Sequence, residues 1–183
     1  NYRRCMIKDV HDHIKFLMTD NVHVWYFIMG ISPNSSESKG QFCGDSNEFV
    51  GGQFIGKITA THKYPYGPPD VVMLTPTNIF PLHNNDFCID IGKYHKEDYP
   101  ATLGMDGYTK MIWSGLIGWK SIGNGINLID TNVPVEERIL SIKRASLNSQ
   151  KYNEIKNREI LNMFKEASYF ESKNNESKND ESK

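Results

Sequence analysis

The stretch "GGQFIGKITATHKYPYGPPDVVMLTP", residues 51–76, holds two strand patterns separated by a turn rich in proline and glycine. Its first part alternates between two sets of residues, which are Phe54, Gly56, Ile58, Ala60 and Gln53, Ile55, Lys57, Thr59. This period of two is typical of a β-strand with one buried face. The segment "DVVMLTP" (70–76) predicts another strand, which Pro76 ends.

Two further apolar segments precede this stretch, namely "IKFLMTD" (14–20) and "VHVWYFIMGI" (22–31). The second is rich in aromatic and β-branched residues, as strands are. Four successive strands predict an antiparallel meander over residues 14–76. The N-terminus, near Asn1–Lys8, is expected to begin with a short helix.

Residues after 105 follow a helical period, which predicts helices near 107–120, 133–148 and 150–168. Strands followed by helices indicate an α+β fold. We expect one domain over residues 1–170 and a disordered polar tail, "ESKNNESKNDESK" (171–183). The polar segment 33–48 is expected to be a long surface loop.

Composition excludes some classes of function. The net charge is −1, which gives no electrostatic reason to expect a nucleic-acid partner. The three cysteines lie at 5, 43 and 88; they form no disulfide framework and favour a reducing, cytoplasmic compartment. The longest apolar run, 24–31, is too short to span a bilayer, so membrane association would need a segment beyond this chain.

Residues 77–105 fit neither template, and they contain "NNDFCIDIGKYH" (84–95). Cys88 could be a buried thiol, because apolar residues flank it. It could be a metal ligand with His83 and His95, although that spacing matches no usual zinc pattern. It could also be a nucleophile in irregular structure. The residues alone leave these three interpretations open.

A set of motifs in one order resembles ubiquitin-conjugating enzymes: Gly51-Gly52, "YPYGPP" (64–69), "MLTP" (73–76), Asn78 and Cys88. The resemblance extends from the N-terminus to about residue 168. "TPTN" (75–78), together with a histidine seven positions after the cysteine, is similar to the divergent Thr-Pro-Asn subgroup. Some members of that subgroup are anchored in the endoplasmic reticulum.

The resemblance implies that Cys88 accepts ubiquitin from an activating enzyme as a thioester and passes it to a substrate lysine, usually with a ligase. Asn78 would stabilise an oxyanion or brace its loop. Asp90 would orient or deprotonate the lysine, and His95 is a further candidate catalytic residue. No metal or cofactor is implied. The implied partner contacts are Ala60, Tyr66, Pro100 and Ala101 for the ligase, and Arg3 and Arg4 for the activating enzyme.

The sequence also departs from the family pattern. Ala60 stands where the family often has an aromatic residue, and "TPTN" is one residue longer than Thr-Pro-Asn, so that Thr77 or Asn78 occupies the amide position. Two other functions stay open. One is a non-catalytic variant that binds ubiquitin-like folds. The other is a cysteine hydrolase with Cys88 as nucleophile and His95 as base.

Overall fold

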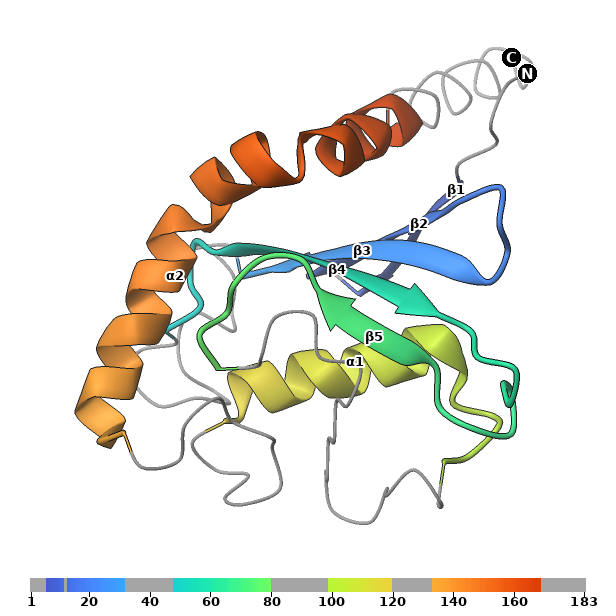
Figure 1. Cartoon of the computed structure of the whole chain (residues 1–183), viewed down its shortest axis with the longest axis horizontal. Coiled ribbons are helices and arrows are strands. Elements are labelled where there is room, and N and C mark those ends of the chain that lie inside the picture. Colours follow the sequence, from blue (N-terminus) through green and yellow to red (C-terminus); the bar gives the residue numbers. More distant parts are fainter. Residues whose placement is uncertain (1–5, 12, 32–47, 80–98, 120–132, 169–183) are drawn as a thin grey trace, which may run out of the picture.

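The computed structural model describes residues 6–11, 13–31, 48–79, 99–119 and 133–168, and of residues 6–11 it describes the backbone. The predicted meander is confirmed. Its strands are β2 (Ile14–Met18), β3 (Val24–Gly30), β4 (Gln53–Thr59) and β5 (Asp70–Met73). Neighbours in sequence pair antiparallel throughout (Figure 1).

A fifth strand, β1 (Met6–His11), extends the sheet at the edge of β2, giving the order β1-β2-β3-β4-β5. The prediction of a helix near Asn1–Lys8 is therefore wrong for residues 6–8, and residues 1–5 lie outside the described part. The reason is tertiary: β1 pairs with β2 in the register Met6↔Met18. This pairing satisfies backbone groups of β2 that an edge would leave unpaired.

The inner face of the sheet carries the main core. Alternate strand positions supply Phe16, Phe27, Met29, Phe54 and Ile58, which pack in one cluster with helix α1 (Gly104–Ile117). From α1 come Tyr108, Ile112, Trp113 and Leu116. Burying each such side chain stabilises the fold by about 1.5–3 kcal/mol. The alternating apolar residues of the strands and the apolar face of α1 thus form a single hydrophobic core.

Gly56 is required by a close approach within this core. It pairs with Phe27 of β3 across the sheet. A β-carbon at Gly56 would lie 2.1 Å from Cζ of the Phe27 ring. Position 56 is therefore a glycine because a larger side chain there would overlap with the Phe27 ring.

The helices differ from their predicted bounds. Helix α1 begins three residues before the predicted range 107–120. Helix α2 (Val135–Lys156) runs on where we predicted a break near 148–150, and a last helix covers 158–168. The break lies instead at Asn157. At the predicted break, Ser149 is part of the continuous helix, where it is buried and makes hydrogen bonds inside the fold.

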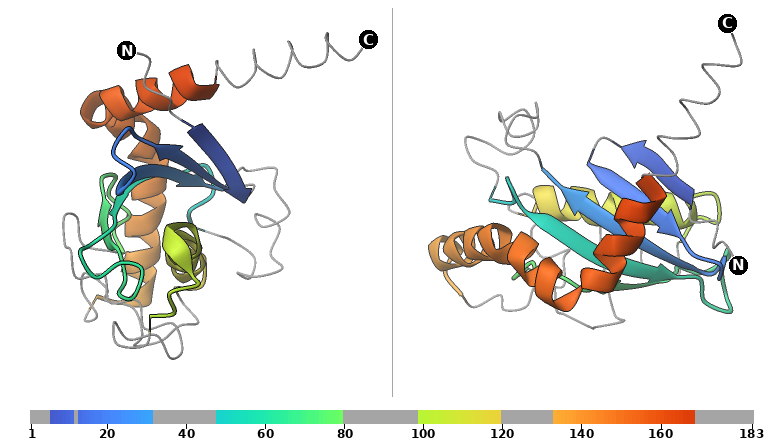
Figure 2. Two further views of the ribbon diagram at one scale, coloured as in Figure 1. Left: turned by 90° about the vertical axis from the view of Figure 1, so that its right-hand side faces the viewer. Right: turned by 90° about the horizontal axis from the view of Figure 1, so that it is seen from above.

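Three layers result. Helix α1 lies under the inner face of the sheet, and helix 158–168 crosses the outer face (Figure 2). On that outer face Phe164 and Ala167 pack against Leu17 of β2. Helix α2 stands at the end of the sheet and contacts β4. Within the described ranges, no helix combines the length and the apolar character needed to cross a bilayer.

Candidate active site

Most of the predicted catalytic residues lie outside the described residues. These are Cys88, Asp90 and His95, together with His83 and the partner-contact candidates Arg3 and Arg4. The predicted tail 171–183 and most of the predicted loop 33–48 also lie outside. Of that loop the structure describes Glu48, which is buried rather than at the surface. The structure does describe the residues that precede and follow this segment in the chain, 48–79 and 99–119.

Thr75 fixes the segment that leads toward Cys88. It is fully buried. Its hydroxyl accepts a hydrogen bond from the Ile55 N–H at 2.9 Å and donates one to Oδ1 of Asn153 at 2.5 Å. Because Ile55 belongs to β4 and Asn153 to α2, this one hydroxyl ties the "TPTN" segment to both elements.

The inner face of α2 continues this pattern with a row of polar side chains, which we call the polar ladder. Its members are Ser146, Ser149, Asn153 and, directly after the helix, Asn157, all buried. They bind backbone groups in the turn before β4 and beside the ends of β4 and β5. Ser146 donates to the Glu48 carbonyl, Ser149 accepts from the Gln53 N–H, Asn153 donates to the Gln53 carbonyl, and Asn157 donates to the Leu74 carbonyl. The ladder therefore satisfies buried peptide groups that no strand partner reaches.

Asn78 has a left-handed backbone with φ of 57°, a conformation that glycine and asparagine adopt more readily than other residues. Its Nδ2 lies 3.0 Å from the carbonyl oxygen of Ser141 and 2.9 Å from the Ser141 hydroxyl oxygen. The Asn78 amide is thus engaged with Ser141 of α2. Thr77 before it is fully buried, and its hydroxyl accepts the Ile79 N–H at 3.2 Å.

Two substitutions separate the backbone and side-chain contributions of Asn78. Asn78→Ala should lower the free energy of unfolding by about 2–3 kcal/mol, because it loses the amide contact and strains the left-handed backbone. Asn78→Gly loses the amide contact alone and should cost about 1 kcal/mol. Urea denaturation of both variants measures the difference. Equal losses would mean that the left-handed conformation is not needed.

The two predicted ligase-contact loops meet at one end of the molecule. The first, between β4 and β5, carries Tyr64, whose hydroxyl would lie 3.9 Å from a β-carbon placed at Gly104 at the start of α1. Tyr66 in this loop is 85% exposed. In the second loop Ala101 is exposed and Pro100 is half-buried, whereas Ala60 is half-buried and packs on the core. Tyr66 and Ala101 thus lie on adjoining loops.

Tyr99 holds the second loop in place. Its hydroxyl donates a hydrogen bond to the Gly104 carbonyl at 3.2 Å, and its ring lies edge-on to Tyr108 with centroids 5.8 Å apart. Burial, followed by the nearby Tyr64 and Tyr108 phenols and Asp106, raises the pKa of Tyr99 from 10.0 to about 12. The phenol is therefore a neutral donor at physiological pH.

This raised pKa predicts a pH dependence. Below pH 10 Tyr99 is protonated in both the folded and the unfolded chain, and its full contribution to stability is present. Between pH 10 and about 12 the unfolded chain loses the proton first, so ionisation favours unfolding. Wild type should therefore be more stable than Tyr99→Phe at pH 8, and this advantage should shrink above pH 10. Denaturant titrations of both proteins across this range measure it; an advantage that grows above pH 10 would contradict the assignment.

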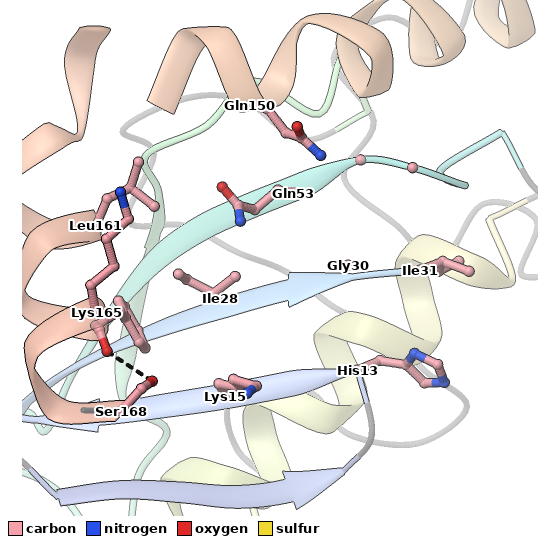
Figure 3. Close-up of a pocket in the computed structure, with 13 residues that line it drawn as sticks. His13, Lys15, Ile28, Gly30, Ile31, Gln53, Gln150, Leu161, Lys165 and Ser168 are labelled. Atoms are coloured by element: carbon pink, nitrogen blue, oxygen red, sulfur yellow. Dashed lines mark hydrogen bonds between the residues drawn. The ribbon is translucent and has the colours of Figure 1, made fainter. Parts of the chain in front are cut away.

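The outer face of the sheet bears a groove of about 600 Å³ (Figure 3). Bases line it from two directions, with Lys15 on β2 and Lys165 on helix 158–168, and no lining residue is acidic. Ile28, Leu161 and Phe164 supply apolar surface. Sequence analysis missed this groove, although the alternation of β2 and β3 does place Lys15 and Ile28 on the outer face.

The metal interpretation of Cys88 involves residues outside the described part. In the ranges that the structure does describe, no group of three histidine, cysteine, aspartate or glutamate side chains could hold a metal ion.

An antiparallel meander whose last strand leads through a braced Thr-Pro-Thr-Asn segment toward a cysteine is what we expect of a ubiquitin-conjugating enzyme. Similarity to known proteins supports that family. The chain is 25% identical over 130 residues to ubiquitin-conjugating enzyme E2 6 of Candida glabrata, covering 71% of this chain and 46% of the relative. It is 28% identical over 104 residues to ubiquitin-conjugating enzyme E2 J2-like of Dictyostelium discoideum, covering 56% and 57%.

A third relative is ubiquitin-conjugating enzyme E2 J1 of Homo sapiens, 27% identical over 120 residues, which cover 61% of this chain and 34% of the relative. The chain spans about half the length of the first curated relatives it matches. No family model matches the chain. The similarity therefore supports the ubiquitin-conjugating enzyme family and covers part of each relative.

Proposed function

We propose that this protein is a ubiquitin-conjugating enzyme that carries ubiquitin as a thioester on Cys88 and transfers it to a substrate lysine, usually with a ligase. The observation that carries the proposal is the similarity to ubiquitin-conjugating enzymes E2, in a chain where Cys88 follows the "TPTN" segment. The subgroup that we infer is the divergent Thr-Pro-Asn one, consistent with likeness to the E2 6 and E2 J1 enzymes. The scattered cysteines favour a cytoplasmic location.

The proposed chemistry has two acyl transfers. The Cys88 thiolate attacks the thioester that joins ubiquitin to the activating enzyme, and the cysteine of the activating enzyme leaves as a thiolate. A substrate lysine amine then attacks the Cys88 thioester, an isopeptide bond forms, and Cys88 leaves as a thiolate. A lysine has an ordinary pKa of about 10.4, so removing its proton near pH 7 costs about 4–5 kcal/mol. In the proposal, Asp90 offsets part of that cost by orienting or deprotonating the amine.

The Asn78 contact with Ser141 supports a bracing role in this chemistry. With its amide held by α2, Asn78 fixes the start of the segment that leads to the thioester, and His95 is proposed to act on the other side of Cys88. The adjoining loops with Tyr66, Pro100 and Ala101 are the proposed ligase contact, and Arg3 and Arg4 the proposed contact for the activating enzyme. Ala60 stays a proposed contact with little exposed surface.

Asp90 gives a sharp kinetic prediction. Asp90→Ser should slow the discharge of ubiquitin onto free lysine by about ten- to a hundredfold, the low end of general-base effects. The charging step should change little, because no ammonium takes part in it. Asp86→Ser, two residues before the cysteine, is the matched control and should discharge like wild type. Equal rates of lysine discharge in wild type and Asp90→Ser would mean that Asp90 is a surface aspartate with no part in the transfer step.

A pulse-chase experiment tests the function as a whole. The protein is charged with activating enzyme, ATP and ubiquitin, charging is stopped, and the thioester is chased with lysine, serine, threonine or buffer. A conjugating enzyme should transfer faster to lysine than to the hydroxyl amino acids, with slow loss in buffer. Rapid loss in buffer would instead identify a cysteine hydrolase, and ubiquitin binding without any adduct would identify a non-catalytic binding module.

A further inference from the structure

After its first turns, helix α2 differs in polarity from an ordinary amphipathic helix. Its buried residues are Ile142, which belongs to the apolar core, and then three members of the polar ladder, Ser146, Ser149 and Asn153. Its outer face exposes Leu140 at 55%, Leu147 at 81% and Ile155 at 61%. Leucine favours helices by itself, but the β-branched Ile155 does not. Helix propensity therefore does not explain the whole set of exposed apolar residues.

These apolar residues form a continuous seam with two bases, which we call the outer stripe: Leu140, Arg144, Leu147, Lys151 and Ile155. Successive members are three or four residues apart, so they lie on one side of the helix. This is the spacing at which one helix presents residues to another helix. The outer stripe faces away from the sheet, and in Figure 1 α2 forms the left edge of the molecule.

The centre of the outer stripe is positively charged. Residues 139–153 contain Lys143, Arg144 and Lys151 but no aspartate or glutamate, and all three bases are exposed. Among the described residues no ion pair involves these three side chains. The apolar and cationic groups together match a partner with apolar side chains and carboxylates at helical spacing.

Two other occupants fit less well. An anionic bilayer is broad and would also meet the exposed Glu136, Glu137 and Glu154, which flank the cationic centre and repel anionic lipid. A helix can instead place its carboxylates only opposite Arg144 and Lys151. A second copy of this chain, packed antiparallel along the stripe, would place Arg144 of one copy beside Lys151 of the other. A parallel arrangement would pair Arg144 with itself. Both arrangements bring cations together at the centre of the contact.

We propose that the outer stripe of α2 is a docking surface for an amphipathic helix of a partner protein. The apolar residues of that helix cover Leu140, Leu147 and Ile155, and its carboxylates pair with Arg144 and Lys151. This interaction is independent of Cys88 and of the proposed conjugation chemistry. It uses the helix whose other face holds the "TPTN" segment, so a docked partner lies on the element that positions the active-site segment.

The test uses the full chain and two labelled synthetic helical peptides of equal length. Both carry leucines at the spacing of the outer stripe. One has glutamates at the positions that face Arg144 and Lys151, and the other has lysines there. Fluorescence anisotropy should show that the glutamate peptide binds at least about tenfold more tightly than the lysine peptide. Leu147→Gln should weaken glutamate-peptide binding at least about tenfold.

Charge reversal gives the decisive comparison. The double variant Arg144→Glu, Lys151→Glu should lose the glutamate peptide and gain the lysine peptide. The control, Lys156→Glu with Lys165→Glu, changes the net charge equally off the stripe and should bind like wild type. Melting curves verify that each variant is folded. Equal binding of both peptides to wild type, or no switch in the double variant, would overturn the proposal.

Two further measurements test whether a membrane or a second copy of the chain occupies the outer stripe instead. Binding of wild type, but not Leu147→Gln, to vesicles of phosphatidylcholine and phosphatidylserine would make the stripe a membrane contact and overturn the proposal. Self-association in sedimentation equilibrium that Leu147→Gln abolishes would make it a contact between copies and likewise overturn it. We expect neither. The lysine discharge assay is run in parallel and should be unchanged in Leu147→Gln, so that failure of this proposal is distinct from failure of the conjugation proposal.

Discussion

Cys88→Ala is expected to form no ubiquitin adduct under conditions in which the wild-type protein becomes charged. Only a thiolate at this position can accept the ubiquitin carboxyl group and leave again as lysine attacks. Cys88→Ser should form an adduct more slowly, and that adduct should resist reductant because an oxygen ester replaces the thioester. Gels run with and without reductant after incubation with activating enzyme, ATP and ubiquitin measure all three proteins.

The other two cysteines provide matched controls for this prediction. Cys5→Ala and Cys43→Ala should each charge like wild type. An adduct that persists in Cys88→Ala and disappears in either of these variants would move the acceptor away from Cys88. An adduct that persists in all three single variants would point to a different nucleophile.

Asn153→Ala should lower the free energy of unfolding by about 3–5 kcal/mol. Asn153 is fully buried. It accepts from the Thr75 hydroxyl and the Asn157 amide and donates to the Gln53 carbonyl. Each buried group left without a partner costs about 1–3 kcal/mol. The loss is less than the sum of three such terms, because groups in one network relax together.

Urea denaturation measures this loss, with Asn148→Ala as the matched control. Asn148 lies on the same helix, is exposed, and donates to the Arg144 carbonyl at the surface. Its substitution should change stability by about 0.5 kcal/mol or less. A similar small change in Asn153→Ala would mean that the polar ladder does not hold α2 against the sheet. The segment that leads to Cys88 would then need another anchor.

The sheet could be predicted from sequence because the alternation of apolar residues that marks a strand lies within a few consecutive residues. Ile14 and Phe16 are two residues apart in one segment, and Phe27 and Met29 are two residues apart in the next. This period of two indicates one buried face. The strand β1 could not be predicted in this way, since its pairing with β2 is a tertiary preference that overrides a weak local one. The sequence does not show that residues 6–8 belong to a strand that pairs with β2.

The continuous helix α2 was missed for a different reason. Sequence patterns assign apolar residues to the inside, yet Ser149 and Asn153 are buried and Leu147 is exposed. The backbone groups of Gln53, which Ser149 and Asn153 bind, explain this reversal. Those partners are far away in sequence, so no local pattern could reveal them.

In the candidate site, too, the features that are local in sequence could be predicted, and the contacts between distant elements could not. The order of motifs around "YPYGPP" and "TPTN" predicts a family and a cysteine, because such motifs are contiguous in sequence. The Asn78 contact with Ser141 and the approach of Tyr64 to Gly104 depend on the packing of distant elements. The roles of Cys88, Asp90 and His95 rest on the sequence and stay predictions.

The most direct test of the central claim is to identify the residue that carries ubiquitin in the wild-type protein. After charging with activating enzyme, ATP and ubiquitin, intact-mass measurement under non-reducing conditions gives the adduct, and proteolysis at low pH followed by peptide sequencing locates it. We predict a mass increase of one ubiquitin less one water, on the peptide that contains Cys88, which reductant removes. An adduct on Cys5, Cys43 or a lysine, with the Cys88 peptide unmodified, would contradict the account.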